Sequence, residues 1–586
     1  MVLDKINGPQ DVKALNRAEL KELAGDIRAV LLEKLSNYGG HFGPNFGIVE
    51  ATIALHYVFN SPVDKFVFDV SHQSYPHKIL TGRKEAYIDP AHYKDVTGYT
   101  EPKESIHDMF TIGHTSTSIS MACGLAKARD LDGRNENVVA IIGDGSLSGG
   151  EAYEGLSCGS RLGTNLIVLL NDNNMSISDV NGGLYGHLQE LRNSKGTCAN
   201  NMFKALGFEY IYEENGNDVE SMICVLERVK DIDHPVVIHI HTQKGKGYQP
   251  AEINREDWHW FPPFVKETGE KRRPMTGENY DNLVADYLVE KMKKDPSVIA
   301  MCAAVPATIG FDKAHRNAAG KQFIDVDICE QHLLSMAAGV ARNGGKPVVA
   351  TFSTFYQRAY DQIAQDICIN KMPVTILIRN GSIWAGNDVT HLGWFDMALF
   401  SNIPNLVFLC PTNCEEYFAM LDWSIEQKEH PVIIRIPRGK VIHTENEVEK
   451  DYSDLNKFLV TQKGEKVAIL ALGDFYPIGE EVACAIKEHL GFIPTLINPR
   501  YASGVDTDLL NELKKDHGLV VTIEDSILDG GFGQKVASFL GTAKIEVLNY
   551  GLDKEFLDGY DAKEVMAKYG LTTESIIHDI QSLSVK

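Results

Sequence analysis

The sequence has little of several features that mark whole classes of protein. Its ten cysteines are scattered over 586 residues without a CxxC pair. The nearest two, Cys410 and Cys414, lie around PTNCEE without histidines at zinc spacing, so we expect reduced, buried thiols and no metal cluster. No apolar run approaches the roughly 20 residues of a membrane helix, and the N-terminal MVLDKINGPQDVKAL lacks the apolar core of a signal peptide. These absences predict a soluble, cytoplasmic protein.

Positive charge is also in short supply. Lysine and arginine total 57 against 80 aspartates and glutamates, which gives a net charge of −23. A surface this acidic repels nucleic-acid backbones and anionic membranes, so we expect neither as a main partner. A small anionic substrate is still compatible, because it needs only a local basic pocket. With 44% apolar and 23% charged residues, the composition is otherwise that of an ordinary globular protein.

Short β-branched runs alternate with helical patterns along the chain, which predicts parallel sheets covered by helices. Two polar stretches, 262–280 and 440–466, are rich in charge and indicate linkers. They leave domains at 1–270, 281–440 and 462–586, each large enough for its own core. The predicted fold class is therefore α/β, with three doubly wound domains. The expected strands are 65–70, 137–143, 165–171, 235–241, one beginning near 297, 347–352, 373–379, 406–410, 431–436, 466–473, 493–498 and 518–524.

The strongest local signal is VVAIIGDGSLSGGEAYEG at residues 138–155. An apolar strand ends in GDG at residues 143–145, and a helix-compatible stretch follows. Glycines at such a turn let the backbone approach a phosphate, and the helix N-terminus offers N–H groups and the positive end of its dipole. Asp144 stands where a carboxylate could hold a Mg²⁺ ion that bridges two phosphates. Taken alone, the motif is more simply interpreted as a turn aspartate that caps a helix.

A second segment changes that interpretation. Residues 166–170 form another buried apolar run, which leads into NDNNM at 171–175. In a parallel sheet both strands end at the same crevice, where ligands bind in open α/β folds. Asp144, the Asn173 side-chain carbonyl and the Met175 backbone carbonyl then make a plausible Mg²⁺ set with two phosphate oxygens. A strand with GDG, a helix and a strand with NDN is the spacing of a thiamine diphosphate motif.

The whole chain resembles the 1-deoxy-D-xylulose-5-phosphate synthases, which are relatives of transketolase. The matching blocks are FDVSHQSYPHKILTGR (68–83), GHTSTSIS (113–120), NDNNMSIS (171–178), KGKGYQPAE (244–252), ICEQH (328–332), STFYQRAYDQ (353–362) and RIPRG (435–439). The resemblance implies a homodimer with a pyrophosphate-binding, a pyrimidine-binding and a transketolase C-terminal-like domain, the last without catalytic residues. It also implies a reaction: pyruvate is joined to D-glyceraldehyde 3-phosphate, with loss of CO₂, using thiamine diphosphate and Mg²⁺.

Two residues of the second domain match the part of the family that activates the cofactor. Glu330 resembles the catalytic glutamate, whose carboxyl shares a proton with N1′ of the aminopyrimidine and therefore needs shelter from water and a raised pKa. The alternative is an ordinary glutamate at a helix N-terminus. Phe355 resembles the aromatic residue that packs on the pyrimidine ring, with a plain core phenylalanine as the alternative.

Six histidines fall in matched blocks: His41, His72, His77, His114, His259 and His391. The resemblance implies that His72 and His114 contact the cofactor, whereas His41, His259 and His391 face the substrates. An imidazole there can donate to a carboxylate or relay protons near neutral pH. A lone histidine is more often structural or simply exposed, so each assignment depends on its block. The other cofactor-lining positions implied by the resemblance are Gly113, Thr115, Asp144, Gly145, Ser146, Asn173 and Tyr248.

The positions implied to bind the acceptor depart from the family pattern. Asn380 stands where the family has arginine, Asn387 where it has aspartate, and Phe352 where it has tyrosine. Arg358 and Arg438 remain. The predicted cofactor machinery is thus intact, while half of the acceptor pocket is altered.

Two further features bear on these departures. Arg379 precedes Asn380, but neighbouring strand residues point to opposite faces, so we expect its side chain to aim away from the acceptor. In GGHFGPNFG, Pro44 and Asn45 stand where small residues are usual.

Three functions remain in competition. The leading hypothesis is a thiamine-diphosphate carboligase that uses pyruvate and a sugar-phosphate aldehyde. The alternatives are a transketolase-type ketol transfer or ligation with a different acceptor, and a homologue that lost catalysis and serves as a partner subunit. Retention of Glu330, His41 and His72 argues against the last, because a binding protein has no chemical use for them.

Overall fold

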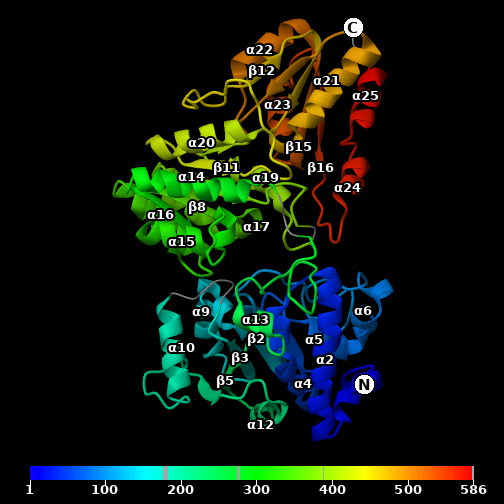
Figure 1. The fold of residues 1–586 in the computed structure, drawn as a ribbon, viewed down its shortest axis with the longest axis vertical. Coiled ribbons are helices and arrows are strands. Elements are labelled where there is room, and N and C mark those ends of the chain that lie inside the picture. Colours follow the sequence, from blue (N-terminus) through cyan, green and yellow to red (C-terminus); the bar gives the residue numbers. More distant parts are fainter. Residues whose placement is uncertain (176–181, 274–276, 387, 584–586) are drawn as a thin grey trace. The chain divides into compact units, whose positions relative to one another are not determined.

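The computed structural model describes the chain except residues 176–181, 274–276, 387 and 584–586. It consists of two compact units, Met1–Thr276 with Asp327–Cys329, and Gly277–Val326 with Glu330–Lys586. Within each unit, helices lie against the faces of sheets (Figure 1). Of the helices in the described ranges, none is long and apolar enough to cross a membrane.

A five-stranded parallel sheet forms the centre of the first unit, in the order β1-β2-β3-β5-β4. Its strands are β1 (Lys65–Phe68), β2 (Val138–Gly143), β3 (Leu166–Asp172), β4 (Glu209–Glu213) and β5 (Pro235–His241). Four of them coincide with predicted strands. Strand β4 is not among the predicted ones, because EYIYE mixes charged and apolar residues and is partly exposed.

The central strands of this sheet are buried on both faces. In β2, Val139 and Ile141 belong to the core on one face. Ala140 and Ile142 belong to the core on the other face. Because strand side chains alternate between faces, a strand covered on both sides must be apolar throughout, as the sequence is here. The main helices of the unit are α2 (Arg17–Tyr38), α4 (Val49–Val58), α7 (Ser118–Leu131), α9 (Gly150–Gly159), α10 (Gly183–Asn193) and α12 (Val219–Val229).

Two sheets form the second unit. One has six parallel strands in the order β10-β11-β9-β8-β6-β7, and the other has the order β12-β14-β13-β15-β16 with an antiparallel edge strand β12. The strands are β6 (Val298–Cys302), β7 (Phe323–Asp325), β8 (Lys346–Phe352), β9 (Thr375–Arg379), β10 (Val407–Leu409), β11 (Val432–Arg435), β12 (Leu459–Gln462), β13 (Lys466–Ala471), β14 (Thr495–Asn498), β15 (His517–Ile527) and β16 (Glu546–Leu552). The α/β fold class with three sheets is confirmed.

The unpredicted strands of the second unit, β7, β12 and β16, share one property. Each is short or includes partly exposed residues, so none shows the continuous apolar run used to predict strands. The longer helices of the unit are α14 (Tyr280–Lys294), α16 (Glu330–Arg342), α20 (Cys414–Glu426), α21 (Tyr476–Leu490), α22 (Thr507–Asp516), α23 (Phe532–Leu540) and α25 (Thr573–Ser582).

The predicted linker 440–466 is a packed part of the second unit. Tyr452 is 1% exposed, and its backbone carbonyl accepts a hydrogen bond from the Tyr501 hydroxyl at 3.0 Å. The end of the stretch supplies β12. A few buried aromatic side chains are enough to anchor a segment whose overall composition is polar. The stretch is therefore packed despite its polar composition, and its role as a connection between domains stays a prediction.

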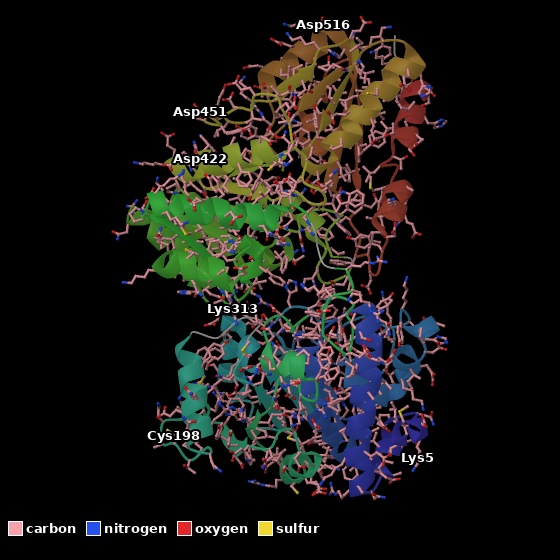
Figure 2. All side chains as sticks on the ribbon, viewed as in Figure 1. Lys5, Cys198, Lys313, Asp422, Asp451 and Asp516 are labelled. Atoms are coloured by element: carbon pink, nitrogen blue, oxygen red, sulfur yellow. The ribbon has the colours of Figure 1, made fainter. Side chains whose placement is uncertain are left out.

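Charged side chains lie at the surface, as Lys5, Lys313 and Asp516 illustrate (Figure 2). Three of the ten cysteines, at positions 158, 224 and 484, are also exposed. The expectation that the thiols are buried is wrong for these three, because each stands on the solvent side of a helix whose apolar side faces the core.

A buried ion cluster joins the two sheets of the second unit. Arg435, the last residue of β11, donates two hydrogen bonds to Asp396 and one to Asp525 of β15. Both carboxylate side chains are 0% exposed. Asp396 begins the short helix α19 (Asp396–Phe400). Buried charges of this kind are tolerated only while their partners remain in place.

We predict that Arg435→Met strongly destabilises the protein. The substitution leaves Asp396 and Asp525 buried without their cation, which typically costs about 3–5 kcal/mol. Calorimetric melting temperatures of the variant and of Arg342→Met, a control at an exposed arginine, measure the effect. Equal melting temperatures for the two variants would contradict the structural role of the cluster.

Candidate active site

Loops at one edge of the first sheet carry most of the predicted cofactor residues. Asp144 follows β2 and begins the short helix α8 (Asp144–Leu147), and Asn173 follows β3. Because all neighbouring strands of this sheet run parallel, the loops after their carboxyl ends emerge on the same side. The sheet topology thus gathers residues that are well separated in the sequence.

The three predicted magnesium ligands lie together at this edge. Asp144 is 2% exposed, and its Oδ2 atom accepts a hydrogen bond from the Met175 N–H at 3.1 Å. Within the described ranges, the Asn173 Oδ1 atom is buried and has no hydrogen-bond partner. A buried oxygen in this state is costly unless a cation or a donor approaches it. The group therefore fits a bound Mg²⁺ ion.

A second buried carboxylate, Asp172, lies beside Asp144. Asp172 forms an ion pair with Arg192 and a hydrogen bond with His239 Nε2 at 2.8 Å. Burial opposes ionisation, but the contact with His239 and the charge of Arg192 lower the pKa of Asp172 to about 2. Burial and the charge of Asp172 raise the pKa of Asp144 well above its usual range. A divalent cation would relieve this repulsion.

Asp69 anchors the loop 113–115, which is predicted to line the cofactor, by hydrogen bonds to the residues that follow it. This carboxylate is 1% exposed and accepts hydrogen bonds from the backbone N–H groups of Ser116 at 2.8 Å and Ser118 at 3.0 Å. The Ser116 hydroxyl donates to the carbonyl of Ser146 at 2.8 Å. These contacts tie the loop to the one after β2. Asp69 is not among the predicted residues, although it directly follows β1.

Three predicted histidines come together in the first unit. The ring centroids of His41 and His72 are 5.0 Å apart, and that of His259 lies 5.7 Å from His41 and 5.1 Å from His72. The His259 Nδ1 atom is buried. Burial, the charge of Lys244 and the other two rings lower the pKa of His259 well below its usual range. The His259 ring is therefore neutral at neutral pH.

Asn45, at a position where the chain departs from the family, holds two of these histidines in place. Its side chain is fully buried, and its Nδ2 atom donates to the backbone carbonyls of His41 at 2.7 Å and His72 at 2.8 Å. Its Oδ1 atom accepts a hydrogen bond from the Tyr75 N–H at 2.9 Å. The Asn45 side chain thus links the two loops that carry His41 and His72.

Lys244 belongs to the site but is absent from the predicted residues. It is 2% exposed, and burial lowers its pKa to about 8 while the charge of Asp144 opposes the shift. Its aliphatic stem lies against Gly43, where an added Cβ would be 3.0 Å from Lys244 Cγ. Tyr248, which was predicted to line the cofactor, instead points its hydroxyl at the carbonyl of Lys266, at 2.9 Å.

Glu330, the predicted catalytic glutamate, begins α16 in the second unit. It is 4% exposed, and its Oε2 atom lies 3.5 Å from Nη1 of Arg358. Burial raises the pKa of Glu330, and the positive charge of Arg358 opposes that shift. The carboxyl is therefore both sheltered and easier to protonate than an exposed glutamate, which are the two properties that its predicted role requires.

The predicted aromatic and histidine residues of the second unit are neighbours. The Phe355 ring centroid lies 5.2 Å from that of Phe352 and 5.5 Å from that of His391. His391 is oriented by Asp388, whose Oδ1 atom lies 2.9 Å from Nδ1 of the ring. Phe355 is only half-buried, which argues against the alternative of a plain core phenylalanine.

The predicted acceptor residues cluster at the carboxyl ends of β8, β9 and β11, which are adjacent in the sheet. Asn380 follows β9 and its Oδ1 atom is buried without a hydrogen-bond partner in the described chain. Arg438 is half-buried and its backbone N–H donates to Asp474. Arg379 pairs with Asp281 of α14. Asn387 lies outside the described residues.

The chain matches family models along most of its length. Residues 3–199 match 1-deoxy-D-xylulose-5-phosphate synthase, and residues 112–294 match the thiamine diphosphate binding domain of transketolase. Residues 278–442 match the pyrimidine binding domain of transketolase, and residues 456–576 match its C-terminal domain.

Full-length relatives agree with these matches. The chain is 38% identical to a 1-deoxy-D-xylulose-5-phosphate synthase of Caldanaerobacter subterraneus subsp. tengcongensis, with 99% of this chain and 98% of the relative covered. It is also 38% identical to the enzyme of the same name from Listeria monocytogenes serotype 4b, with 99% and 97% covered. Among solved structures, the transketolase of Campylobacter jejuni is 18% identical with a TM-score of 0.44, covering 97% of this chain and all of that one.

We predict that Asp144→Ala abolishes Mg²⁺-dependent binding of thiamine diphosphate. Without this carboxylate the ion loses its main anionic protein ligand, and an affinity loss of at least about a hundredfold follows. Titration calorimetry in the presence of Mg²⁺ measures it, with Asp132→Ala, at an exposed aspartate, as the control. An unchanged affinity in Asp144→Ala would contradict the assignment.

We further predict that Glu330→Gln binds thiamine diphosphate nearly as well as the wild type but stops proton exchange at the cofactor C2. The amide keeps the shape of the side chain yet does not exchange a proton with the aminopyrimidine, so exchange slows by about 10²–10⁴-fold. NMR of deuterium incorporation at C2 decides the point, with Glu290→Gln, on the surface, as the control. Exchange at the wild-type rate would show that Glu330 has another role.

Proposed function

The chain belongs to the 1-deoxy-D-xylulose-5-phosphate synthase family, and from this premise we propose that it condenses pyruvate with D-glyceraldehyde 3-phosphate, with release of CO₂, to form 1-deoxy-D-xylulose 5-phosphate. The observation that carries the proposal is the group of Asp144, Asn173 and Met175, in which the Asp144 carboxylate and the Asn173 Oδ1 atom are buried and offer oxygen ligands suited to Mg²⁺.

The residues of the first unit fit thiamine diphosphate with its magnesium ion. Asp144, the Asn173 side-chain carbonyl and the Met175 backbone carbonyl would hold the ion, and the loop that includes Gly145 and Ser146 would hold the diphosphate. When bound, the cofactor supplies a carbon nucleophile and an electron sink for decarboxylation. The protein's own contribution is to anchor, orient and shelter that chemistry.

Glu330 holds the proton that activation of the cofactor requires. Burial raises its pKa, so its carboxyl exchanges a proton more readily near neutral pH than an exposed glutamate does. Arg358, 3.5 Å away, keeps part of the anionic form populated. This balance lets the carboxyl both donate and accept.

The histidine cluster of the first unit is suited to the pyruvate and aldehyde oxygens. With its pKa lowered by burial and by the charge of Lys244, His259 is neutral at neutral pH. A neutral imidazole offers one N–H donor and one acceptor nitrogen, so it can bind an oxygen and pass a proton. The ring centroids of His41 and His72 lie within 6 Å of that of His259, and the charge of Lys244 lowers the pKa of His259.

The acceptor's phosphate meets a weaker set of cations than the family pattern has. Arg438 and Arg358 remain, but Asn380 offers no charge. Burial and the nearby charge of Arg438 lower the pKa of Arg379 to about 9, and Arg379 is already paired with Asp281. It is therefore not available to replace the missing arginine. This favours a second candidate function, the same carboligation with a different aldehyde acceptor.

We also propose three domains at 1–270, 281–440 and 462–586, assembled as a homodimer that acts on small molecules in the cytoplasm, without nucleic-acid or membrane partners. The two polar stretches between these ranges and the family matches at 278–442 and 456–576 support the boundaries. Sedimentation of the purified protein measures the assembly.

The reaction itself is tested by incubating the protein with thiamine diphosphate, Mg²⁺ and pyruvate, with and without glyceraldehyde 3-phosphate. We expect CO₂ release and an acceptor-dependent 1-deoxy-D-xylulose 5-phosphate product. CO₂ release without that product would favour the different acceptor, which a screen of aldehydes identifies. Absence of CO₂ with saturating cofactor would support the inert homologue and overturn the proposal.

We predict that Asn380→Arg lowers the KM for glyceraldehyde 3-phosphate by about ten- to a hundredfold. One restored charge-assisted hydrogen bond to a phosphate is worth about 1.5–3 kcal/mol. Because Asn380 has a left-handed backbone (φ +58°), the arginine also costs about 1–2 kcal/mol of stability, so melting temperature is measured alongside the kinetics. Asn343→Arg, at an exposed site, is the control for added charge. A low-micromolar KM in the wild type that Asn380→Arg does not improve would refute the altered pocket.

A further inference from the structure

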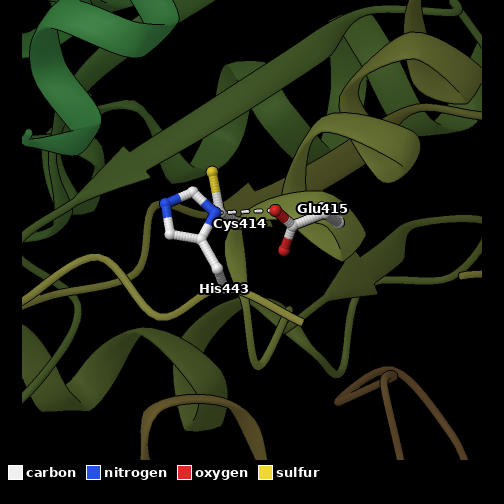
Figure 3. A group of neighbouring side chains, drawn as sticks. All are labelled: Cys414, Glu415 and His443. Carbon is white, nitrogen blue, oxygen red and sulfur yellow. Dashed lines mark hydrogen bonds and ion pairs between the residues drawn. The ribbon is translucent and has the colours of Figure 1, made fainter. Parts of the chain in front are cut away.

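Three side chains with metal-binding atoms meet in the second unit, apart from the residues of the proposed reaction. Cys414 and Glu415 are the first two residues of α20, and His443 lies beyond β11. The Cys414 Sγ atom, a carboxylate oxygen of Glu415 and a ring nitrogen of His443 all lie within 4.8 Å of one another. Figure 3 shows the sulfur and the carboxylate beside the imidazole ring.

Backbone contacts hold the two segments together at this point. The Cys414 N–H donates to the carbonyl of Ile442 at 2.8 Å. The Thr444 N–H donates to Glu415 Oε2, also at 2.8 Å. The other oxygen of Glu415, Oε1, lies 2.7 Å from His443 Nδ1. Hydrogen bonds from main-chain N–H groups therefore help to hold the three side chains close together.

A fourth residue sets the orientation of the imidazole. The Glu278 Oε2 atom lies 2.6 Å from His443 Nε2, on the side of the ring opposite Glu415. A carboxylate there accepts the Nε2 proton, so that loss of the Nδ1 proton would leave the Nδ1 lone pair for a metal ion. Metal-binding histidines in proteins almost always have such a carboxylate or carbonyl partner on their second nitrogen.

We propose that Cys414, Glu415 and His443 bind a zinc ion, that a water molecule completes its coordination, and that Glu278 is the carboxylate that orients His443. Thiolate, imidazole and carboxylate are the ligand types that zinc takes in tetrahedral sites. Zinc–ligand bonds of about 2.0–2.3 Å place neighbouring donors roughly 3.3–3.8 Å apart. The 2.7 Å contact between Glu415 and His443 therefore has to widen by about 1 Å or less.

The structure permits that adjustment. The side chains of His443 and Glu415 are 52% and 36% exposed, so both can move and an ion can enter from solvent. Cys414 is the buried member of the set, and burial raises the pKa of its thiol to about 11. Zinc takes the thiolate, so binding releases the thiol proton to water. Contacts with Glu415 and Glu278 raise the pKa of His443, so a proton on Nδ1 is the competitor that the metal displaces.

The ion would join three segments of the second unit: the residues just before α14, the start of α20 and the stretch after β11. It would thus attach residues 440–458 to α14 and α20, two helices of the domain that contains the six-stranded sheet. Mg²⁺ does not compete for this site, because Mg²⁺ prefers oxygen ligands and octahedral geometry. The two metals therefore occupy different places in one chain.

A zinc titration of the full chain tests the proposal. The protein is first saturated with Mg²⁺ and thiamine diphosphate, and a chromophoric chelator that competes for zinc reports the affinity. We expect one tight zinc equivalent per chain. Cys414→Ser and His443→Asn should each weaken binding by at least about tenfold, and Glu278→Gln by about 10–100-fold. Cys484→Ser and His430→Asn, which change a cysteine and a histidine elsewhere in the second unit, should leave the affinity unchanged.

Cobalt(II) gives an independent readout. A thiolate ligand to Co²⁺ produces a charge-transfer band in the near ultraviolet, which we expect in the wild type and not in Cys414→Ser. His443→Asn changes an exposed side chain, so its result stands even if the buried Cys414→Ser variant folds poorly. The proposal is overturned if the wild type binds no zinc beyond the His443→Asn variant, or if Co²⁺ bound to it shows no thiolate band.

Discussion

Buried carboxylates, and the positive charge that each one needs, govern how the candidate functional residues are arranged within each unit. Burying an anion is costly unless a cation or several donors compensate it. Asp144 and Asp172 are two such anions side by side, with Arg192 paired to only one of them. Their arrangement makes sense with a divalent cation between Asp144, Asn173 and Met175. The same constraint explains why the loops that carry these residues are themselves fastened by buried groups such as Asp69.

The second unit applies the constraint in two different ways. Asp396 and Asp525 share one cation, Arg435, whose hydrogen bonds to both carboxylates join the two sheets. Glu330 is compensated only in part by Arg358 at 3.5 Å, and its pKa stays raised. Short hydrogen bonds from one guanidinium to both carboxylates suit a structural group. A single cation at a longer distance suits a group that must exchange a proton. The arrangement of nearby positive charge thus distinguishes a structural carboxylate from a reactive one within the same unit.

Much of the site could be predicted because its residues follow strands that are recognisable in the sequence as apolar runs. Asp144 and Asn173 are found in this way, and so is Glu330 through its family block. Asn45 and Lys244 were missed as site residues, since nothing local distinguishes a buried asparagine or lysine from an exposed one. The proximity of His443 to Cys414 was not predicted, because a helix and a strand separate the two in sequence.

The sequence alone was enough to predict the positions of most strands, the α/β class and the edge at which the loops of parallel strands meet. The physical reason is that strand burial on both faces demands continuous apolar runs, and parallel order places all carboxyl ends together. Only the tertiary structure decided which distant side chains touch. Separate elements have to pack together before Asn45 can contact His41 and His72, before Lys244 can approach Asp144, and before Cys414 can meet His443. Short-range sequence patterns do not predict such packing.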